Sequence, residues 1–533
     1  MRRRCLFWVV SWLAIGMSAC TTLKPPRQPQ GLETAKACTD WRWIGISRHG
    51  ARCPEIRGWT VQALFPQLAP ASRKSDDYCA TKEGDYCKER ESEKVPSSEL
   101  IQELNRFCVY EPADPKKGTK DLPFPLSASA DLVKLDQDCA SISSTDRELD
   151  PNDWKADHMD FIPREPETPL KIDKAGVRLA FLDTQPTEEV IPKTSGNSPH
   201  GFTLVHLARQ LLCAPGSYTH CAAHITTQLA LPIVKFDPKT FKNNEIDPKR
   251  GGYLGMPSDL AQAIRDEVDS WRSANAQQHL VLNLSVAWDG NLFGGLSEEQ
   301  IDEMRAGTQA VYYALQYAAS FDVLVLAAAG NQKIEPCANF GPLLPAAWEK
   351  TVPEGGRCPR EPQKTPLLYA VGGVQHDGLR LTNARPGGMP QRAAYGETAV
   401  LLSVDPETVY NKKIYSGSSI ATAYASSIAA AVWSASPELD SHGVMNRLYE
   451  KGHPLNFNAD FWFDDVVQPA ARLLSLCTAL KLPCAPFRLG AASPRPTGFE
   501  ISSRGSCQPW LYPQPDDPPC LNSNCPPKGP LTR

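Results

Sequence analysis

A serine stands at a position in this chain that suits a nucleophile. Ser419 follows Gly417 near the start of Ser416–Pro437, a stretch filled almost entirely with small residues. The Ala and Ser content predicts a closely packed helix over Ser419–Ser434, roughly 24 Å long. The Ser419 hydroxyl would then lie beside first-turn N–H groups, which have no intrahelical partner. The alternative for this stretch alone is a core helix with a serine N-cap.

Three other residues stand at the ends of predicted strands or before a predicted helix. Val177–Leu182 is a mostly apolar strand followed by Asp183, and Asp322–Ala328 is a further apolar strand that runs towards Asn331. His200 precedes a segment with apolar residues at helical spacing. The carboxyl ends of parallel strands are a usual place for function in an α/β sheet. Taken singly, each residue also fits an ordinary role as a turn cap or a surface residue.

Together these residues resemble the subtilisin-type serine proteases, the subtilases. The chain order Asp, His, Ser is the order of that family. The stretches VLVLAAAGN, ending at Asn331, and SGSSIATA, around Ser419, resemble its asparagine and nucleophile motifs, and FLDT and HGFTLVHLARQL resemble its aspartate and histidine motifs. The resemblance covers Lys174–Leu476 and implies a three-layer α/β fold with a mostly parallel central sheet.

The resemblance implies a role for each of these residues. Ser419 is the expected nucleophile, and His200 the base that later protonates the leaving amine, while Asp183 orients the imidazole. Asn331 and the Ser419 N–H would form the oxyanion hole, where losing one donor costs roughly 2.7–4 kcal/mol. The strand over Asn283–Trp288 would pair with substrate backbone. The residues expected to bind substrate are Leu284, Ser285, Val286, Ala328, Ala329 and Gly330.

The chain departs from the family's pattern at four points. Asp183 and His200 are only seventeen residues apart, which predicts an abbreviated loop before the histidine. Ser418 replaces a threonine, and Ala423 replaces the proline that usually kinks the helix after the nucleophile. Phe202 stands where a small hydroxyl residue is common. None of these changes removes a chemical group, so the resemblance still implies an active serine endopeptidase.

Beyond the four motifs, strands alternate with helices from Gly176 onward, which favours a mostly parallel sheet with helices on both faces. The apolar stretch Val466–Leu476 is expected to be helical and to end this core. The segment after Cys38 is rich in cysteine and charge and is expected to be an irregular, disulfide-stapled module. The predicted division is a signal peptide (1–19), a tether (20–37), a Cys-rich N-terminal module (38–172), a catalytic domain (173–476) and a Pro/Cys-rich C-terminal extension (477–533).

The first twenty residues resemble an export signal. Arg2–Arg4 form a basic region and Leu6–Ile15 an apolar run too short to span a membrane comfortably. The residues ending at Cys20 resemble the lipobox of bacterial lipoproteins, which implies cleavage before Cys20 and its lipidation. The alternatives are secretory cleavage near Ala19 and a twin-arginine signal. We expect a lipid-anchored protein of the bacterial cell envelope, in the outer membrane or periplasm, or a secreted one.

Cysteine usage agrees with export. Seventeen cysteines are present, and the close pairs predict disulfides more readily than metal sites. These pairs are Cys79/Cys87, Cys213/Cys221, Cys337/Cys358 and Cys477/Cys484. No zinc-module spacing occurs, so no metal ligand is assigned and no cofactor is expected, while structural calcium stays open. The net charge of −4 gives no pull towards nucleic acid; polypeptides are the expected substrates, with lipidated Cys20 as the only membrane link.

Three alternatives remain. Arg48-His49-Gly50-x-Arg52-x-Pro54 matches the R-H-G-x-R-x-P signature of histidine acid phosphatases, and His376-Asp377 matches their late His-Asp pair. That interpretation leaves the asparagine and nucleophile motifs unexplained. An α/β-hydrolase would need an aspartate and then a histidine after its serine. The residues available after Ser419, Asp460 and His453, stand in the opposite order. A degenerate protease acting as a binding lipoprotein would not need all four catalytic residues that the chain retains.

Overall fold

The computed structural model describes the chain from Cys38 to Leu482 with gaps, and the statements below concern these residues. The described residues are 38–48, 52–66, 96–113, 131–139, 142–143, 147–149, 176–185, 198, 200–214, 220–235, 245–274, 279–290, 304–332, 341–350, 366–385, 387–402, 411–459 and 470–482. The predicted signal peptide, Cys20, the tether and the C-terminal extension beyond Leu482 lie outside them.

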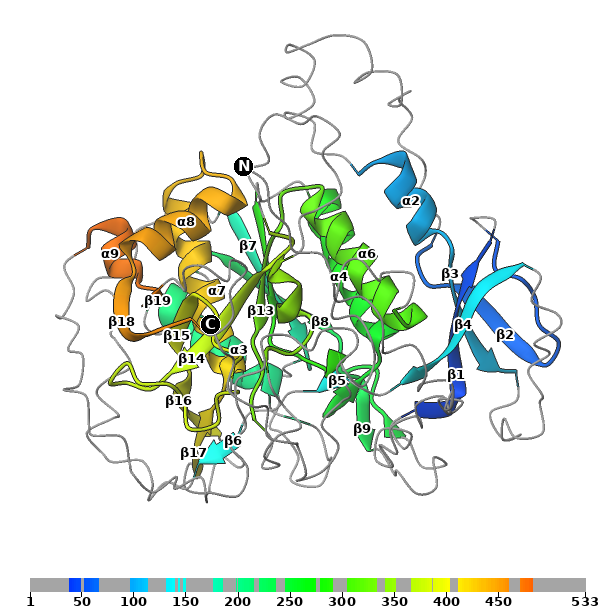
Figure 1. Cartoon of the computed structure of the whole chain (residues 1–533), viewed down its shortest axis with the longest axis horizontal. Coiled ribbons are helices and arrows are strands. Elements are labelled where there is room, and N and C mark those ends of the chain that lie inside the picture. Colours follow the sequence, from blue (N-terminus) through cyan, green and yellow to red (C-terminus); the bar gives the residue numbers. More distant parts are fainter. Residues whose placement is uncertain are drawn as a thin grey trace, which may run out of the picture.

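Within the described residues, eight strands form the central sheet in the order β18-β19-β15-β14-β13-β12-β7-β8. All neighbouring pairs are parallel except β18 and β19. The prediction of a mostly parallel sheet is confirmed (Figure 1). The strands are β7 (Val177–Asp183), β8 (His224–Leu229), β12 (His279–Leu284), β13 (Leu324–Ala328), β14 (Tyr369–Val374), β15 (Arg392–Tyr395), β18 (His453–Asn458) and β19 (Ala470–Leu473).

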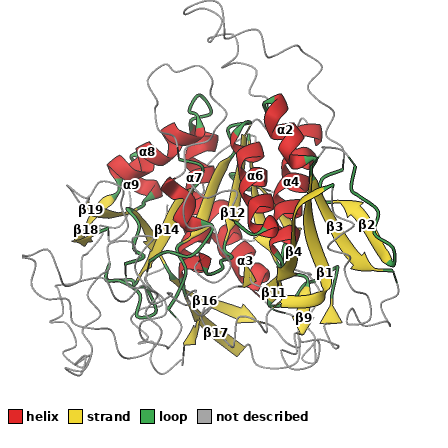
Figure 2. Ribbon diagram, turned by 45° about the vertical axis from the view of Figure 1, so that its right-hand side comes forward, coloured by secondary structure: helices red, strands yellow, loops and turns green. Residues whose placement is uncertain are grey.

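Helices cover both faces of this sheet (Figures 1 and 2). Successive residues of β7 alternate between two cores, because strand side chains point to opposite faces. Leu179 and Phe181 join the core under α3 and α7, whereas Ala180 and Leu182 join the core under α4 and α6. The helices are α3 (His200–Leu212), α4 (Pro257–Ala274), α6 (Ala306–Ala319), α7 (Ser418–Ala435), α8 (Ser441–Lys451) and α9 (Leu476–Leu480), with a short 3₁₀ helix at Ala346–Lys350.

The last strand corrects one sequence prediction. Val466–Leu476 was expected to be helical, but Ala470–Leu473 is β19, which pairs with β15 and β18. A short apolar run does not distinguish a buried strand from a helix. The helix predicted over Ser419–Ser434, by contrast, matches α7 to within one residue at each end. No helix among the described residues is long and apolar enough to cross a membrane.

The N-terminal segment forms a more regular structure than its composition suggests. The antiparallel sheet β2-β3-β1-β4 is built from β1 (Cys38–Ser47), β2 (Trp59–Ala63), β3 (Phe107–Pro112) and β4 (Leu132–Cys139), preceded at β3 by helix α2 (Ser98–Leu104). The sheet packs against α4 and α6 through β1 and β4. A disulfide joins Cys53, after β1, to Cys108 in β3.

Two small sheets flank the central one. The order β10-β9-β11-β5 joins Glu245–Ile246, Ile233–Lys235, Leu254–Gly255 and Ile142–Ser143, and the order β16-β17-β6 joins Glu397–Leu402, Asn411–Ser416 and Arg147–Leu149. In both sheets an N-terminal strand, β5 or β6, pairs with strands from much later in the chain (Figure 1).

The disulfide predictions have separate outcomes. Cys213 and Cys221 are bonded, as predicted, between the end of α3 and the approach to β8. Cys477 is disulfide-bonded, but Cys484 lies outside the described residues. The pairs Cys79/Cys87 and Cys337/Cys358 also lie outside them.

Candidate active site

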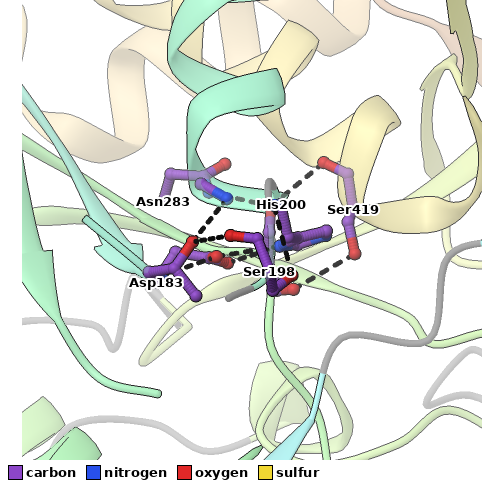
Figure 3. Close-up of polar contacts among 8 residues, drawn as sticks. Asp183, Ser198, His200, Asn283 and Ser419 are labelled. Atoms are coloured by element: carbon purple, nitrogen blue, oxygen red, sulfur yellow. Dashed lines mark hydrogen bonds and ion pairs between the residues drawn. The ribbon is translucent and has the colours of Figure 1, made fainter. Parts of the chain in front are cut away.

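The end of β7 and the start of α3 bring an aspartate and a histidine together. Asp183 is the last residue of β7 and wholly buried, and His200 is the first residue of α3. The His200 Nδ1 lies 2.9 and 2.8 Å from the two carboxylate oxygens of Asp183 (Figure 3). An ionised carboxylate only accepts hydrogen bonds, so Nδ1 carries the proton and Nε2 keeps its lone pair. This tautomer can act as a base at Nε2.

Backbone contacts fix this pair. The Asp183 Oδ1 accepts a hydrogen bond from the Thr184 N–H at 2.7 Å, and the Thr184 Oγ1 accepts one from the Gly201 N–H at 2.8 Å. The His200 N–H donates to the Ser198 Oγ at 3.2 Å (Figure 3). A Cβ on Gly201 would lie 2.0 Å from the Thr184 carbonyl oxygen. Glycine is therefore required after His200 for α3 to approach β7 this closely.

The predicted nucleophile lies at the start of α7. Gly417 is the N-cap, Ser418 the first helical residue and Ser419 the second, 2 % exposed. Helix α7 is buried from Ser418 to Trp433 and packs on α3 and on the central strands. Its small residues permit this approach, and Ala423 leaves the helix unbroken. The Ser419 N–H belongs to the first turn, whose N–H groups have no acceptor within the helix.

A buried chain of hydrogen bonds ties α7 to the end of β12. The Ser426 Oγ donates to the Asn283 Oδ1 at 3.1 Å, and the Asn283 Nδ2 donates to the Ser285 Oγ at 2.8 Å. The Ser285 Oγ donates to the Ser419 carbonyl at 3.0 Å, while the Ser419 Oγ donates to the Ser285 carbonyl at 3.1 Å. Because a hydroxyl has one proton, the Ser419 Oγ–H must turn away from the Ser285 carbonyl before it can donate to a base.

Asn331 is held next to the nucleophile by its own side chain. The Asn331 Oδ1 accepts a hydrogen bond from the Ser418 N–H at 2.8 Å, and the Gly330 N–H donates to the Ser418 Oγ at 3.0 Å. Of the two polar atoms of the side-chain amide only the oxygen can accept from a backbone N–H, so the Asn331 NH₂ group occupies the other branch of the amide. The amide nitrogen is therefore oriented as a donor beside the start of α7.

The predicted substrate-binding residues follow two adjacent parallel strands. Leu284 ends β12 and pairs with Ala327 in β13. The Ala329 N–H donates to Val371 and its carbonyl accepts from the Leu343 N–H, so this backbone is already paired. The edge beyond β12 is also paired: the Ala287 N–H and C=O bond to Ser143 of β5. Ser285, Val286, Ala328 and Gly330 are likewise buried in these two segments.

Sequence reasoning missed several supporting residues. Asn283 and Ser426 received no individual role, although Ser426 lies seven residues after Ser419 on the same helix. Seven residues make about two helical turns and place Ser419 and Ser426 on the same face of α7. This spacing was the sequence signal that could have identified Ser426. The 2.8 Å bond from Gly201 to Thr184 had no sequence signal beyond adjacency to the motifs. Residues 186–197, which hold the abbreviated loop, lie outside the described residues.

The alternative sites are only partly described. Arg48 directly follows β1 and is exposed, whereas His49 and Gly50 lie outside the described residues. His376, after β14 of the central sheet, has its Nδ1 4.0 Å from Glu397. Burial, with repulsion from Asp377 next, raises the pKa of Glu397 to about 7.

The α/β-hydrolase alternative and the question of a metal site concern residues elsewhere in the chain. His453 opens β18, and Asp460 is outside the described residues. Among the residues that are described, no cluster of three His, Cys, Asp or Glu side chains could hold a metal ion.

Comparison with known proteins identifies one family. A model of the subtilase family matches residues 254–453, which include Asn331 and Ser419. Asp183 and His200 lie before this matched segment. No curated protein sequence matches the chain.

The chain is also similar to solved structures of low sequence identity. The prenylagaramide maturation protease PagA is 18 % identical, with a TM-score of 0.36, over 58 % of this chain and 94 % of its own. A cold-adapted subtilisin-like serine proteinase is 16 % identical, with a TM-score of 0.33, over 57 % and 90 %. Fervidolysin from Fervidobacterium pennivorans is 14 % identical, with a TM-score of 0.43, over 72 % and 57 %.

Proposed function

We propose that this chain, a serine endopeptidase of the subtilase family with a subtilisin-like α/β fold, hydrolyses polypeptides through an Asp183/His200/Ser419 triad. The observation that carries the triad is the buried contact of 2.8 Å between the His200 Nδ1 and the Asp183 Oδ2. It leaves the Nε2 of a neutral imidazole as the base, in a site where α3 packs against α7, the helix that carries Ser419 in its first turn.

The proposed reaction has two stages. The Ser419 Oγ turns from the Ser285 carbonyl, attacks the scissile carbonyl carbon and gives its proton to the His200 Nε2. The C–N bond then breaks, and His200 returns the proton to the leaving amine. Water, deprotonated by the same histidine, hydrolyses the acyl-enzyme. Asp183 orients the imidazole and stabilises its charged form throughout.

Asn331 is proposed to stabilise the oxyanion of each tetrahedral intermediate. Its Oδ1 is engaged by the Ser418 N–H, which supports an NH₂ group directed at the nearby reaction centre. The Ser419 N–H in the first turn of α7 is the second proposed donor. These groups supply the proton transfers and charge stabilisation, so the proposed reaction uses no organic cofactor.

The substrate is proposed to be an extended polypeptide. Leu284, Ser285 and Val286 lead to Ala287, whose backbone N–H and C=O pair with Ser143 of β5 and so mark an edge at which an extended strand binds. On the other side of the proposed pocket are Ala328, Ala329 and Gly330. Export is proposed from the sequence alone: a signal peptide cut before Cys20, and lipidation that anchors the protein in the cell envelope. Mass spectrometry of the mature N-terminal peptide tests this, since an unlipidated terminus would contradict it.

Hydrolysis of a denatured polypeptide by matched variants tests the catalytic proposal. Ser419→Ala should abolish peptide-bond hydrolysis, whereas Ser273→Ala, at an exposed serine at the end of α4, should retain it. Phosphate-monoester hydrolysis that survives Ser419→Ala but is lost in His49→Ala would instead support the phosphatase. Undiminished proteolysis by folded Ser419→Ala protein would refute the proposed triad.

A further inference from the structure

Asn383 lies in the connection between β14 and β15, beside the segment that carries Asn331. Its backbone carbonyl accepts a hydrogen bond from the Gln332 N–H at 2.7 Å. The next residue, Ala384, forms an isolated antiparallel bridge with Asn331. Residues opposite each other in an antiparallel pair lie in direct contact across the two backbones. The connection between β14 and β15 therefore lies against the residue that is proposed to stabilise the oxyanion.

The side chain of Asn383 reaches the other half of the site. Its Nδ2 donates to the Ser416 carbonyl at 3.0 Å, across 33 positions of the chain. Ser416 ends β17, and Gly417 alone separates it from Ser418, the first residue of α7. Asn383 and Ser416 are both buried, and a hydrogen bond is electrostatically stronger away from water. This contact is therefore well suited to fix the start of α7.

Three hydrogen bonds close a ring around the proposed oxyanion hole. The first joins the Ser418 N–H to the Asn331 Oδ1 at 2.8 Å. Asn383 supplies the other two. Its Nδ2 holds Ser416, two residues before Ser418. Its carbonyl holds Gln332, the residue after Asn331. The two proposed oxyanion donors belong to the two chain segments that this ring joins, so the ring sets the distance between them.

An amide at this position is unfavourable for packing alone. The Asn383 Oδ1 and the Ser416 Oγ are buried and have no hydrogen-bond partner among the residues that the structure describes. A buried polar group without a partner is destabilising, and an apolar side chain of similar size would avoid that cost. The contact that explains the amide is the hydrogen bond from its Nδ2 to the Ser416 carbonyl.

We propose that Asn383 is a positioning residue for the oxyanion hole, which holds the start of α7 at the distance from Asn331 that lets both donors reach one oxyanion. The proposal rests on the function proposed above for Ser419 and Asn331. Both hydrogen bonds of Asn383 described here go to residues outside the proposed substrate-binding set. The oxyanion forms only during reaction, so the loss of Asn383 lowers kcat and leaves substrate binding in place.

The test measures kcat and KM of the full chain on a peptide substrate. Asn383→Leu keeps the approximate size of the side chain without a donor, and Asn383→Ala removes the donor without needing more space. Both keep the backbone carbonyl that binds Gln332. In each folded variant kcat should fall about 10- to 100-fold, because a misplacement of about 1 Å can cost about 100-fold. KM should stay within about twofold of wild type.

Asn446→Ala is the matched control. The Asn446 Nδ2 lies 2.7 Å from the His442 Nε2 on α8, outside the proposed site. This variant also loses a side-chain amide contact, and it should keep the kcat and KM of wild type. Thermal unfolding identifies which variants fold. A folded Asn383 variant with the kcat of wild type, or with a raised KM and unchanged kcat, overturns the proposal.

A double-mutant cycle distinguishes positioning of the oxyanion hole from a general disturbance. Asn331→Ala removes one of the two donors, so the distance between the donors no longer matters in that background. Adding Asn383→Leu should then lower kcat by less than about threefold, far less than it does in wild type. If the two losses in kcat multiply instead, Asn383 acts independently of Asn331 and the proposal is overturned.

The parent variants separate this proposal from the proposed function. Ser419→Ala should abolish hydrolysis and Asn331→Ala should lower kcat if the proposed function holds. If both do so while the folded Asn383 variants match wild type, the peptidase stands and only the positioning role fails. If Asn331→Ala keeps the kcat of wild type while Ser419→Ala is inactive, the triad stands and the positioning role fails with the oxyanion role. Undiminished hydrolysis by folded Ser419→Ala overturns both proposals.

Discussion

Gly201→Ala should disable the site without removing any catalytic group. The new Cβ would lie 2.0 Å from the Thr184 carbonyl oxygen, where ordinary contact begins near 3.4 Å. Neither atom sits on a flexible side chain, so restoring a contact of 3.4 Å from 2.0 Å requires α3 and the end of β7 to separate by about 1.4 Å. His200 is the adjoining residue and moves with α3. A misplacement of about 1 Å can cost about 100-fold in rate, so kcat/KM should fall by about that factor.

The assay compares Gly201→Ala with Gly176→Ala. A Cβ at Gly176, just before β7, meets nothing within 4 Å, so that variant should keep wild-type kcat/KM on a peptide substrate. Thermal unfolding is measured for both, since a folded but slow Gly201→Ala protein is the informative result. If folded Gly201→Ala retains kcat/KM within threefold of wild type, the close contact between α3 and β7 does not position His200.

Three further predictions concern the histidine's partner, a buried acid and a disulfide. Asp183→Asn keeps the shape of the site but allows the wrong imidazole tautomer, so kcat on a peptide should fall by about 10⁴-fold with the fold retained by circular dichroism; a loss under tenfold would contradict the assigned role. Burial raises the pKa of Glu397 from 4.5 to about 7, so its contribution to stability is complete below pH 4.5 and is lost as pH rises through 7. Relative to wild type, Glu397→Gln should therefore gain unfolding free energy between pH 4.5 and 8, by at most about 3 kcal/mol in urea titrations, and a constant difference across that range would refute this. Replacing both Cys213 and Cys221 by serine opens a short loop at the end of α3 and should cost about 2–3 kcal/mol of unfolding free energy, whereas an unchanged urea midpoint would show that the disulfide adds no stability.

The central strands could be predicted because the apolar composition of each short segment is itself the signal for a buried strand. Val177–Asp183 is mostly apolar and Leu324–Ala328 apolar throughout, and both are buried strands of the parallel sheet. Helix α7 was predictable from its small residues alone, since close packing on two layers leaves little room for larger ones. The strand Ala470–Leu473 could not be predicted in this way. It forms by pairing with β15 and β18, and the local sequence does not reveal these partners.

The types and chain order of the residues were enough to predict which residues form the site, but not how they contact one another. Sequence motifs named Asp183, His200, Asn331 and Ser419, but not the contact that fixes the tautomer. The Ser419 hydroxyl bond to the Ser285 carbonyl spans 134 residues and has no sequence signal.

The pairings of β5 and β6 were equally beyond sequence reasoning. Two- and three-residue strands carry too little pattern to be distinguished from loop. Their partners come from distant segments, so only the folded chain brings these strands together.

A fluorophosphonate probe tests the central claim most directly, because it reacts only with an activated serine. The adduct is located by mass spectrometry in wild type, in His200→Ala and in the exposed-serine control Ser273→Ala. We predict one adduct, on Ser419, retained in Ser273→Ala and lost in His200→Ala. An adduct on another residue, or labelling of Ser419 that persists unchanged in folded His200→Ala protein, would contradict the proposed triad.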